Sequence, residues 1–191
     1  VGAAASTRLA YAAGGSDVLR VGLVGCGGRG AGAAVDALHA DPHAELVAVG
    51  DVFADQAERA LGLIKKDPTI ASRVKVTPET TFSDCDNYRN VIDSGVDVVI
   101  LATPPHFRPE HLEYVVAQGK HCFVEKPVAV DVPGLKRVQA ACEEAEKKGL
   151  SIVSGLCYRY HGGVRAVMDK IREEKAIGDI VAVESSYNTG T

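Results

Sequence analysis

Residues 18–30 read Val18-Leu19-Arg20-Val21-Gly22-Leu23-Val24-Gly25-Cys26-Gly27-Gly28-Arg29-Gly30, and this stretch decides the fold of the chain. Its first half is a short apolar run rich in β-branched side chains, which is typical of a buried parallel strand. Its second half is a Gly-x-Gly-x-x-Gly turn, after which small apolar residues recur at helical spacing until Asp41-Pro42. The stretch therefore predicts a strand, a glycine-rich turn and a helix, in that order.

A turn of this kind can hold a dinucleotide. The first glycine, Gly25, permits the tight turn; the second, Gly27, lets the backbone approach a pyrophosphate; and the third, Gly30, lets helix and strand pack. The helix N-terminus offers free N–H groups and a partial positive charge to phosphates. Asp51 ends the next apolar run about 20 residues later, where an acidic residue is expected to bind the adenosine ribose. Without this context, the glycines could equally form a plain strand-to-helix connection.

Asp51 also indicates which dinucleotide is preferred. Its carboxylate would lie against the additional phosphate of NADP, and two like charges at close range cost on the order of 1 to 4 kcal/mol. NAD is therefore favoured over NADP, although a basic residue from elsewhere in the fold could offset the repulsion. Arg29 lies inside the turn and is expected to contact the pyrophosphate or the substrate, with a solvated arginine on the helix surface as the alternative.

Strands and helices are predicted to alternate through residue 155. Further strands are expected at 44–51, 74–77, 96–103, 121–124 and 151–154. Helices are expected at 53–66, at 110–118, and around Leu135, Val138, Cys142 and Ala145, which fall on one helical face that should pack on the sheet. Such alternation implies right-handed crossovers, so the fold class is α/β, a doubly wound parallel sheet of the Rossmann type.

The sequence predicts three parts. Residues 1–17 are Ala- and Gly-rich and form a flexible N-terminal arm, residues 18–155 form the dinucleotide-binding domain, and residues 156–191 begin an α+β second domain that is truncated. In this last part Val164, Val167, Met168 and Ile171 mark a helix, and residues 180–187 alternate as a strand does. Fewer than about 40 residues seldom form a core of their own.

Composition excludes several classes of protein. The net charge of −4, from 21 basic and 25 acidic side chains, argues against a nucleic-acid partner. Five cysteines without paired spacing suggest neither a metal cluster nor a disulfide framework, so we expect reduced and mostly buried thiols. No apolar run is long enough for a membrane span. Localisation stays open between the cytoplasm and, if Ala10-Tyr11-Ala12 is the remnant of an export signal, the periplasm.

Glu125-Lys126-Pro127 ends a predicted parallel strand. Ligands of open α/β sheets bind in the crevice beyond the carboxyl ends of the strands, so Lys126 is well located for chemistry. Its ammonium group could donate a hydrogen bond to a ribose or to a substrate hydroxyl, and it could stabilise an alkoxide as that hydroxyl loses its proton. Taken alone, the residue could also be a surface lysine in a turn.

Four segments together resemble the glucose-fructose oxidoreductase and inositol dehydrogenase family, called Gfo/Idh/MocA. They are residues 21–30, Ala102-Thr103-Pro104-Pro105-His106, Gly119-Lys120-His121 and Glu125-Lys126-Pro127. The resemblance implies that Gly25, Cys26, Gly27, Gly28, Arg29 and Gly30 form the pyrophosphate turn and that Asp51 holds the adenosine ribose. It places Thr103, Pro104 and His106 at the nicotinamide, Glu125 and Lys126 at the nicotinamide ribose and reaction centre, and Arg159 near the cofactor.

The resemblance also implies a function. The chain would belong to a NAD-dependent oxidoreductase that moves a hydride between nicotinamide and a hydroxyl-bearing carbon of a sugar, cyclitol or polyol, with Lys126 as the catalytic residue. The general-base histidine and the surface of a homo-oligomer would lie in the second domain, beyond Thr191. A NAD-dependent glycosidase of the same superfamily and a non-catalytic NAD-binding fragment are the alternatives.

Overall fold

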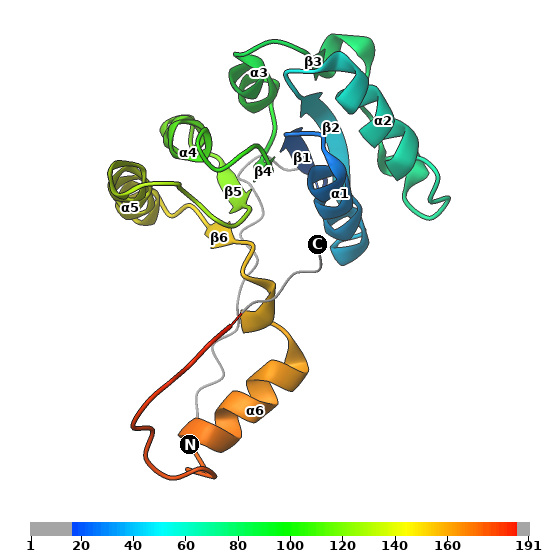
Figure 1. Cartoon of the computed structure of the whole chain (residues 1–191). Helices are drawn as coiled ribbons and strands as arrows, with labels where there is room; N and C mark the ends of the chain where they lie inside the picture. Colours follow the sequence, from blue (N-terminus) through cyan, green and yellow to red (C-terminus); the bar gives the residue numbers. More distant parts are fainter. Residues whose placement is uncertain (1–16, 187–191) are drawn as a thin grey trace. The chain divides into compact units, whose positions relative to one another are not determined.

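The computed structural model describes residues 17–186, and its contacts divide the chain after Gly155 (Figure 1). The N-terminal arm expected at 1–17 lies, apart from Asp17, outside the described residues. No helix in the described part is both long and apolar enough to cross a membrane.

The first unit is built on one sheet of six parallel strands in the order β3-β2-β1-β4-β5-β6. The strands are β1 (Leu19–Val24), β2 (Ala44–Gly50), β3 (Thr81–Phe82), β4 (Val98–Leu101), β5 (His121–Val124) and β6 (Ile152–Ser154). The strand order reverses between β1 and β4, which are direct neighbours. The predicted α/β class with a doubly wound parallel sheet is confirmed.

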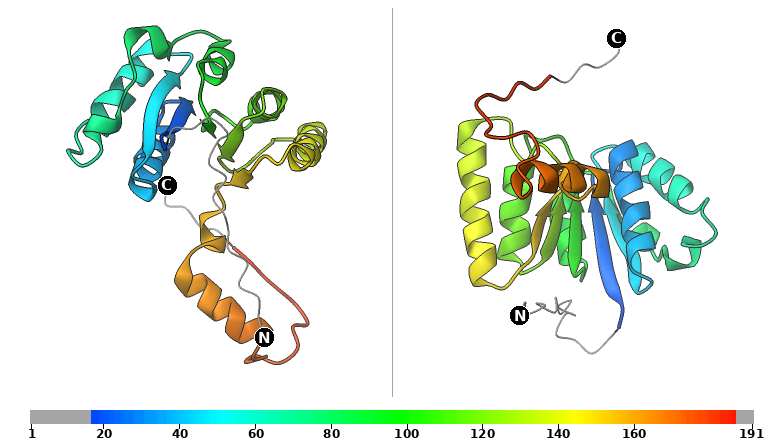
Figure 2. Two further views of the ribbon diagram at one scale, coloured as in Figure 1. Left: turned by 180° about the vertical axis from the view of Figure 1, so that it is seen from behind. Right: turned by 90° about the horizontal axis from the view of Figure 1, so that it is seen from below.

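Helices cover both faces of the sheet (Figures 1 and 2). They are α1 (Gly28–Ala40), α2 (Ala54–Ile64), α3 (Asn87–Asp93), α4 (Arg108–Ala117) and α5 (Val132–Lys147). Neighbouring residues of β1 point to opposite faces, so Leu23 belongs to the core under α1 and α2, whereas Val24 belongs to the core under α3, α4 and α5. β1 therefore contributes side chains to both cores.

The third strand lies later in the sequence than predicted. We expected it at 74–77, but Val74 forms only an isolated parallel bridge with Leu46, and the strand itself is β3 at Thr81–Phe82. A short 3-10 helix at Pro78–Thr80 turns the chain between these two contacts with β2. A strand of two residues carries no periodic signal, and α3, which follows it, was not predicted either.

The buried face of α5 is offset from the predicted one. Val138 and Ala145 are buried as expected, but Leu135 is 48% exposed and Cys142 is also exposed. The buried stripe consists of Gly134, Val138, Ala141 and Ala145. The helix lies close to α4, since a Cβ on Gly134 would come within 3.2 Å of the Pro109 Cγ. Small residues, and not the larger Leu135, therefore make the contact.

The expectation of mostly buried cysteines was wrong. All five thiols are free, but only Cys26 and Cys122 are buried, whereas Cys85, Cys142 and Cys157 are exposed. The two buried ones follow or lie within central strands, while the others lie in a loop, on the outer face of α5 and in the short 3-10 helix at Cys157–Arg159. Position in the fold, and not residue type, sets their burial.

The second unit begins at Leu156. The helix predicted around Val164 is confirmed as α6 (Gly162–Arg172), and none of its residues is buried. The strand expected at 180–187 is not formed over residues 180–186, and Tyr187 lies outside the described residues. A strand needs a neighbour for its backbone hydrogen bonds, and within residues 156–186 no second strand is present to provide them.

Candidate functional site

Three of the predicted segments meet at one edge of the sheet. The register pairs Val24 of β1 with Leu101 of β4, and Leu101 with Val124 of β5, so the three strands end level with one another. The glycine turn, the loop after β4 and the Glu125-Lys126-Pro127 segment therefore leave the sheet side by side. This edge lies where the strand order reverses, the place at which open α/β sheets bind ligands. Arg159 belongs to the second unit and is not among these residues.

The glycine turn has the geometry that its sequence predicts. Gly25 has φ +91°, a backbone conformation that residues with a Cβ rarely adopt. A Cβ there would lie 2.6 Å from the Thr103 amide nitrogen. A Cβ on Gly30 would lie only 1.9 Å from the Gly25 carbonyl oxygen. The tight turn at Gly25 and the close packing at Gly30 are thus confirmed.

The two middle glycines face open space. A Cβ on Gly27 or Gly28 would meet no atom of the described residues within 4 Å, and both residues are exposed. Gly27 is the N-cap of the 13-residue helix α1, which has neither a side-chain cap nor an acidic residue in its first turn. The first N–H groups of α1 are therefore free to receive an anionic group such as a phosphate.

Asp51 lies against the same turn. Its Oδ2 accepts a hydrogen bond of 2.7 Å from the Cys26 amide, and its Oδ1 accepts one of 3.0 Å from the Phe53 amide. The carboxylate is thus already aimed at the turn that follows β1. By contrast, the side chain of Cys26 points into the core, where burial and the Asp51 charge raise the pKa of its thiol to about 12. Only the backbone of Cys26 belongs to the site.

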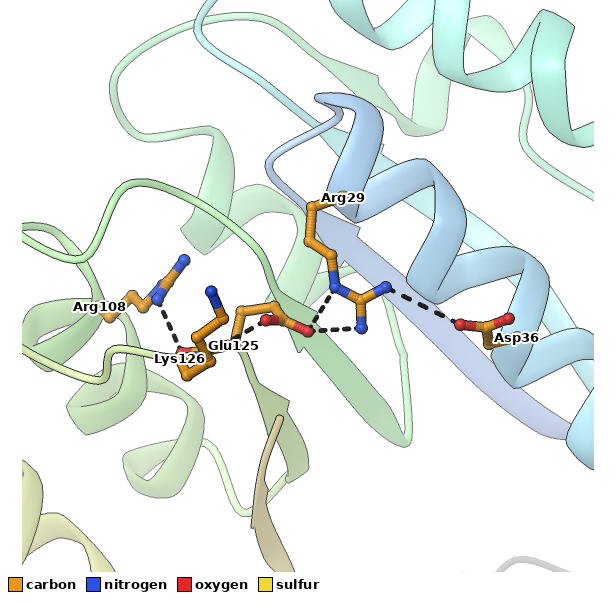
Figure 3. A network of polar contacts seen from close by, with 5 residues as sticks. All are labelled: Arg29, Asp36, Arg108, Glu125 and Lys126. Atoms are coloured by element: carbon orange, nitrogen blue, oxygen red, sulfur yellow. Dashed lines mark hydrogen bonds and ion pairs between the residues drawn. The ribbon is translucent and has the colours of Figure 1, made fainter. Parts of the chain in front are cut away.

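Arg29 bridges the turn to the end of β5. Its Nε and Nη2 lie 2.7 and 2.6 Å from Oε1 of Glu125, and its Nη1 lies 3.8 Å from Asp36 (Figure 3). Glu125 is 2% exposed, so Arg29 supplies the counter-charge of a buried carboxylate. The Arg29 side chain is half exposed, but it pairs with a buried carboxylate. It is therefore not the freely solvated arginine that was the alternative interpretation.

Lys126 is exposed, but the backbone around it is held in place. Its amide donates to Oε2 of Glu125 at 3.3 Å, and the Lys126–Pro127 peptide bond is cis. A buried guanidinium, that of Arg108, donates through Nη1 to the carbonyl oxygen of Glu125 at 2.7 Å and also to that of Pro127. Burial lowers the pKa of the Arg108 guanidinium below its usual range.

Arg108 and Gly155 also belong to this site, although the sequence does not mark them. Arg108 occupies the first position of α4, ahead of a helix-starting proline, which is an ordinary sequence context. Gly155 follows β6, and a Cβ there would lie 2.8 Å from Oε1 of Glu125. Both act through contacts with a distant segment, so no local pattern marks them.

The loop after β4 contributes Thr103, Pro104 and His106. Pro104 and His106 are exposed, whereas Thr103 is half-buried, with its Oγ1 3.3 Å from Nδ1 of His111. The imidazole of His111 is buried and stacks on Tyr88 at 4.1 Å between ring centres. Burial lowers its pKa to about 4, so the ring is neutral near pH 7 and supports Thr103 without adding charge.

The low pKa of His111 predicts a pH-dependent stability. The folded protein resists protonation that the unfolded chain accepts near pH 6.5, so stability should fall as the pH drops from 6.5 towards 4. The contribution of this one group is a slope of up to about 1.4 kcal/mol per pH unit. Urea unfolding at several pH values should show that His111→Gln flattens this slope, whereas His43→Gln, at an exposed histidine, does not. An unchanged slope in His111→Gln would contradict the assignment.

Comparisons with known proteins agree with this architecture. The model of the Gfo/Idh/MocA family, an oxidoreductase family with an NAD-binding Rossmann fold, matches residues 19–153. A glycosyl hydrolase family 109 protein of Streptomyces niveus is 32% identical over 171 residues, which are 89% of this chain and 32% of that protein.

Two solved structures illustrate the likeness in fold. Scyllo-inositol dehydrogenase from Lactobacillus casei, with bound NAD(H) and scyllo-inositol, has a TM-score of 0.65 at 22% identity, over 85% of this chain and 43% of that one. A 3-ketoreductase from Actinomadura kijaniata, in complex with TDP-benzene and NADP, has a TM-score of 0.63 at 26% identity, over 85% and 46%. The chain spans less than half the length of these relatives.

Proposed function

Because the chain belongs to the Gfo/Idh/MocA oxidoreductase family, we propose that residues 18–155 are the NAD-binding domain of a dehydrogenase that acts on a sugar, cyclitol or polyol. Residues 156–191 begin its substrate domain. The observation that carries the proposal is the single sheet edge that holds an open glycine turn, a carboxylate aimed at that turn, and Lys126.

The residues at this edge fit a dinucleotide. The amides of Gly27 and Gly28 lie at the start of α1, where a Cβ would find open space, and they receive the pyrophosphate. Asp51 binds the adenosine ribose at one end. At the other end Thr103, Pro104 and His106 border the nicotinamide, and Glu125 and Lys126 border its ribose. The bound nicotinamide supplies the carbon that accepts or gives a hydride.

Lys126 is the group of this chain that assists the movement of a proton. Its exposed ammonium donates a hydrogen bond to the substrate hydroxyl and stabilises the negative charge that develops on that oxygen as the proton leaves. Glu125 does not compete for this task, because its carboxylate is buried and paired with Arg29. The neutral His111 keeps the Thr103 hydroxyl in place beside the reacting group.

The choice of NAD over NADP follows from Asp51. Its carboxylate already hydrogen-bonds the Cys26 amide, so the additional phosphate of NADP would approach a fixed negative charge. We expect Asp51→Ala to weaken NAD binding about tenfold and to reduce the preference for NAD over NADP by at least that factor. Isothermal calorimetry with both dinucleotides measures these affinities.

Glu143→Ala is the matched control for this experiment. Glu143 is an exposed carboxylate of α5, away from the glycine turn, and should leave both affinities unchanged. If Asp51→Ala kept the ratio of NAD to NADP affinity of the original protein, Asp51 would have no part in the choice. If the original protein bound neither dinucleotide, the proposed function itself would be wrong.

A second candidate function is supported by the family 109 relatives. The likeness to the Streptomyces niveus protein makes a NAD-dependent glycosidase the alternative, in which a sugar is oxidised transiently, the aglycone is eliminated and the hydride returns. Incubation with NAD and aryl glycosides distinguishes the two. Release of free sugar without net NADH identifies the glycosidase, whereas accumulation of NADH with a free polyol identifies the dehydrogenase.

A further inference from the structure

Arg108 is buried in a place that is unfavourable for a cation. It is 6% exposed, and its Nε has no hydrogen-bond partner among the described residues. It also stands at the first position of α4, where the positive end of the helix dipole repels a positive charge. Glu125, the carboxylate whose charge favours the guanidinium, is already paired with Arg29. An apolar side chain of similar length would avoid these costs.

In this position Arg108 fixes the backbone on both sides of Lys126. Nη1 of Arg108 donates to the carbonyl oxygens of Glu125 and Pro127, the residues on either side of the lysine. The Glu125 amide is tied to Leu101 at 2.9 Å, and the Lys126 amide donates to the Glu125 side chain. Apart from the Lys126 carbonyl, the backbone N–H and C=O groups from Glu125 to Pro127 thus form hydrogen bonds within the described residues. These bonds fix the position of the Lys126 Cα, from which the side chain extends.

We propose that Arg108 is the positioning residue of Lys126: its buried guanidinium fixes the two flanking carbonyl groups and so sets where the lysine ammonium meets the nicotinamide ribose and the substrate. The inference rests on the function proposed above. Arg108 is 6% exposed and donates to the backbone on both sides of the lysine, so we assign it to the segment and not to the ligand. It acts on the nicotinamide end alone and leaves the adenosine end, at Asp51 and the glycine turn, unaffected.

This division between the two ends supplies the test. ADP contains the adenosine ribose and the pyrophosphate but lacks the nicotinamide ribose, so it reports on the adenosine end alone. We expect Arg108→Met to weaken NAD binding about tenfold, as the loss of one charge-assisted hydrogen bond does, and to change ADP binding less than twofold. Calorimetry on the 191-residue chain measures both affinities, and thermal unfolding monitors whether each variant is folded.

A double-mutant cycle then tests whether Arg108 acts through the lysine. Lys126→Met should weaken NAD binding about tenfold, and Arg108→Met combined with Lys126→Met should lose no more than Lys126→Met alone. Arg108→Lys, which keeps a donor and a charge, should recover part of the loss. Arg59→Met is the control, because that exposed arginine of α2 pairs with Asp55 and with no other carboxylate among residues 17–186, and it should bind like the original protein.

The outcomes separate the inference from the function on which it rests. Losses that multiply in the double variant, or equal weakening of ADP and NAD by Arg108→Met, would show a purely structural role and overturn the inference while NAD binding by the original protein stands. If Arg108→Met does not fold, Arg108→Lys decides, since it should weaken NAD but not ADP. Failure of the original chain to bind either nucleotide would overturn the proposed function together with the inference.

Discussion

Gly30→Ala is expected to lower the free energy of unfolding by about 3 kcal/mol and to abolish dinucleotide binding. The added Cβ would lie 1.9 Å from the Gly25 carbonyl oxygen, which is a backbone atom and cannot swing away as the end of a side chain can. Either α1 must move outward or the turn after β1 must deform. Both changes displace the amides of Gly27 and Gly28. Urea unfolding and calorimetry with NAD measure the two effects.

Gly62→Ala is the matched control, since it makes the same chemical change in the interior of α2. A Cβ there would meet no atom within 4 Å, so only helix propensity changes and the protein should gain up to about 1 kcal/mol of stability. If Gly30→Ala proved as stable as the original protein and still bound NAD, the helix could relax away from the turn, and close packing at Gly30 would not be what maintains the site.

In the full-length protein, which includes the complete substrate domain, Lys126→Ala should reduce turnover by about 10² to 10⁴, whereas NAD affinity should fall no more than about tenfold. The reason is that an ammonium beside the reacting hydroxyl matters most when that oxygen carries negative charge, which happens in the transition state and not in the bound cofactor complex. The measurement is NADH absorbance with a panel of sugars, cyclitols and polyols, together with calorimetry for NAD.

Two further variants sharpen this prediction. Lys126→Arg keeps the positive charge but spreads it over a larger planar group that does not meet the developing alkoxide at the same point, so it should restore NAD affinity more than turnover. Lys120→Ala removes a lysine just before β5, at the opposite end of that strand, and should leave turnover unchanged. Turnover by Lys126→Ala equal to that of the original protein would remove the residue from the mechanism.

The sequence predicts the central part of this fold because its signals are local. β1 and β5 are short apolar runs bounded by turn residues, and the glycine turn requires a conformation and a close contact that only glycine permits. By contrast, β3 is two residues long and is recognised only through its pairing with Val49 and Gly50 of β2. The face that α5 buries was also predicted inexactly, because its contact with α4 uses Gly134 and Ala141, whose small side chains carry little hydrophobic signal.

In the candidate site too, local signals could be predicted from the sequence and long-range contacts could not. The segments containing Asp51 and Lys126 could be predicted from the sequence, since each ends an apolar run that a parallel sheet brings to one edge. The contacts of Arg29 with Glu125 and of Arg108 with the Pro127 carbonyl could not, because they join segments that are 96 and 19 residues apart. Such pairings depend on the packed structure, and a single sequence does not encode them as a pattern.

The contact between Arg29 and Glu125 also has a mechanical consequence. Arg29 lies on α1, which follows β1, whereas Glu125 follows β5. One guanidinium therefore connects the half of the sheet formed by β1, β2 and β3 with the half formed by β4, β5 and β6. If the two halves slid past each other, the buried carboxylate of Glu125 would lose its counter-charge. An unpaired charge is costly in a medium of low dielectric constant. The ion pair therefore resists sliding of the two halves at the edge of the sheet where the ligand binds. A ligand that contacts both halves requires a fixed separation between its two binding regions.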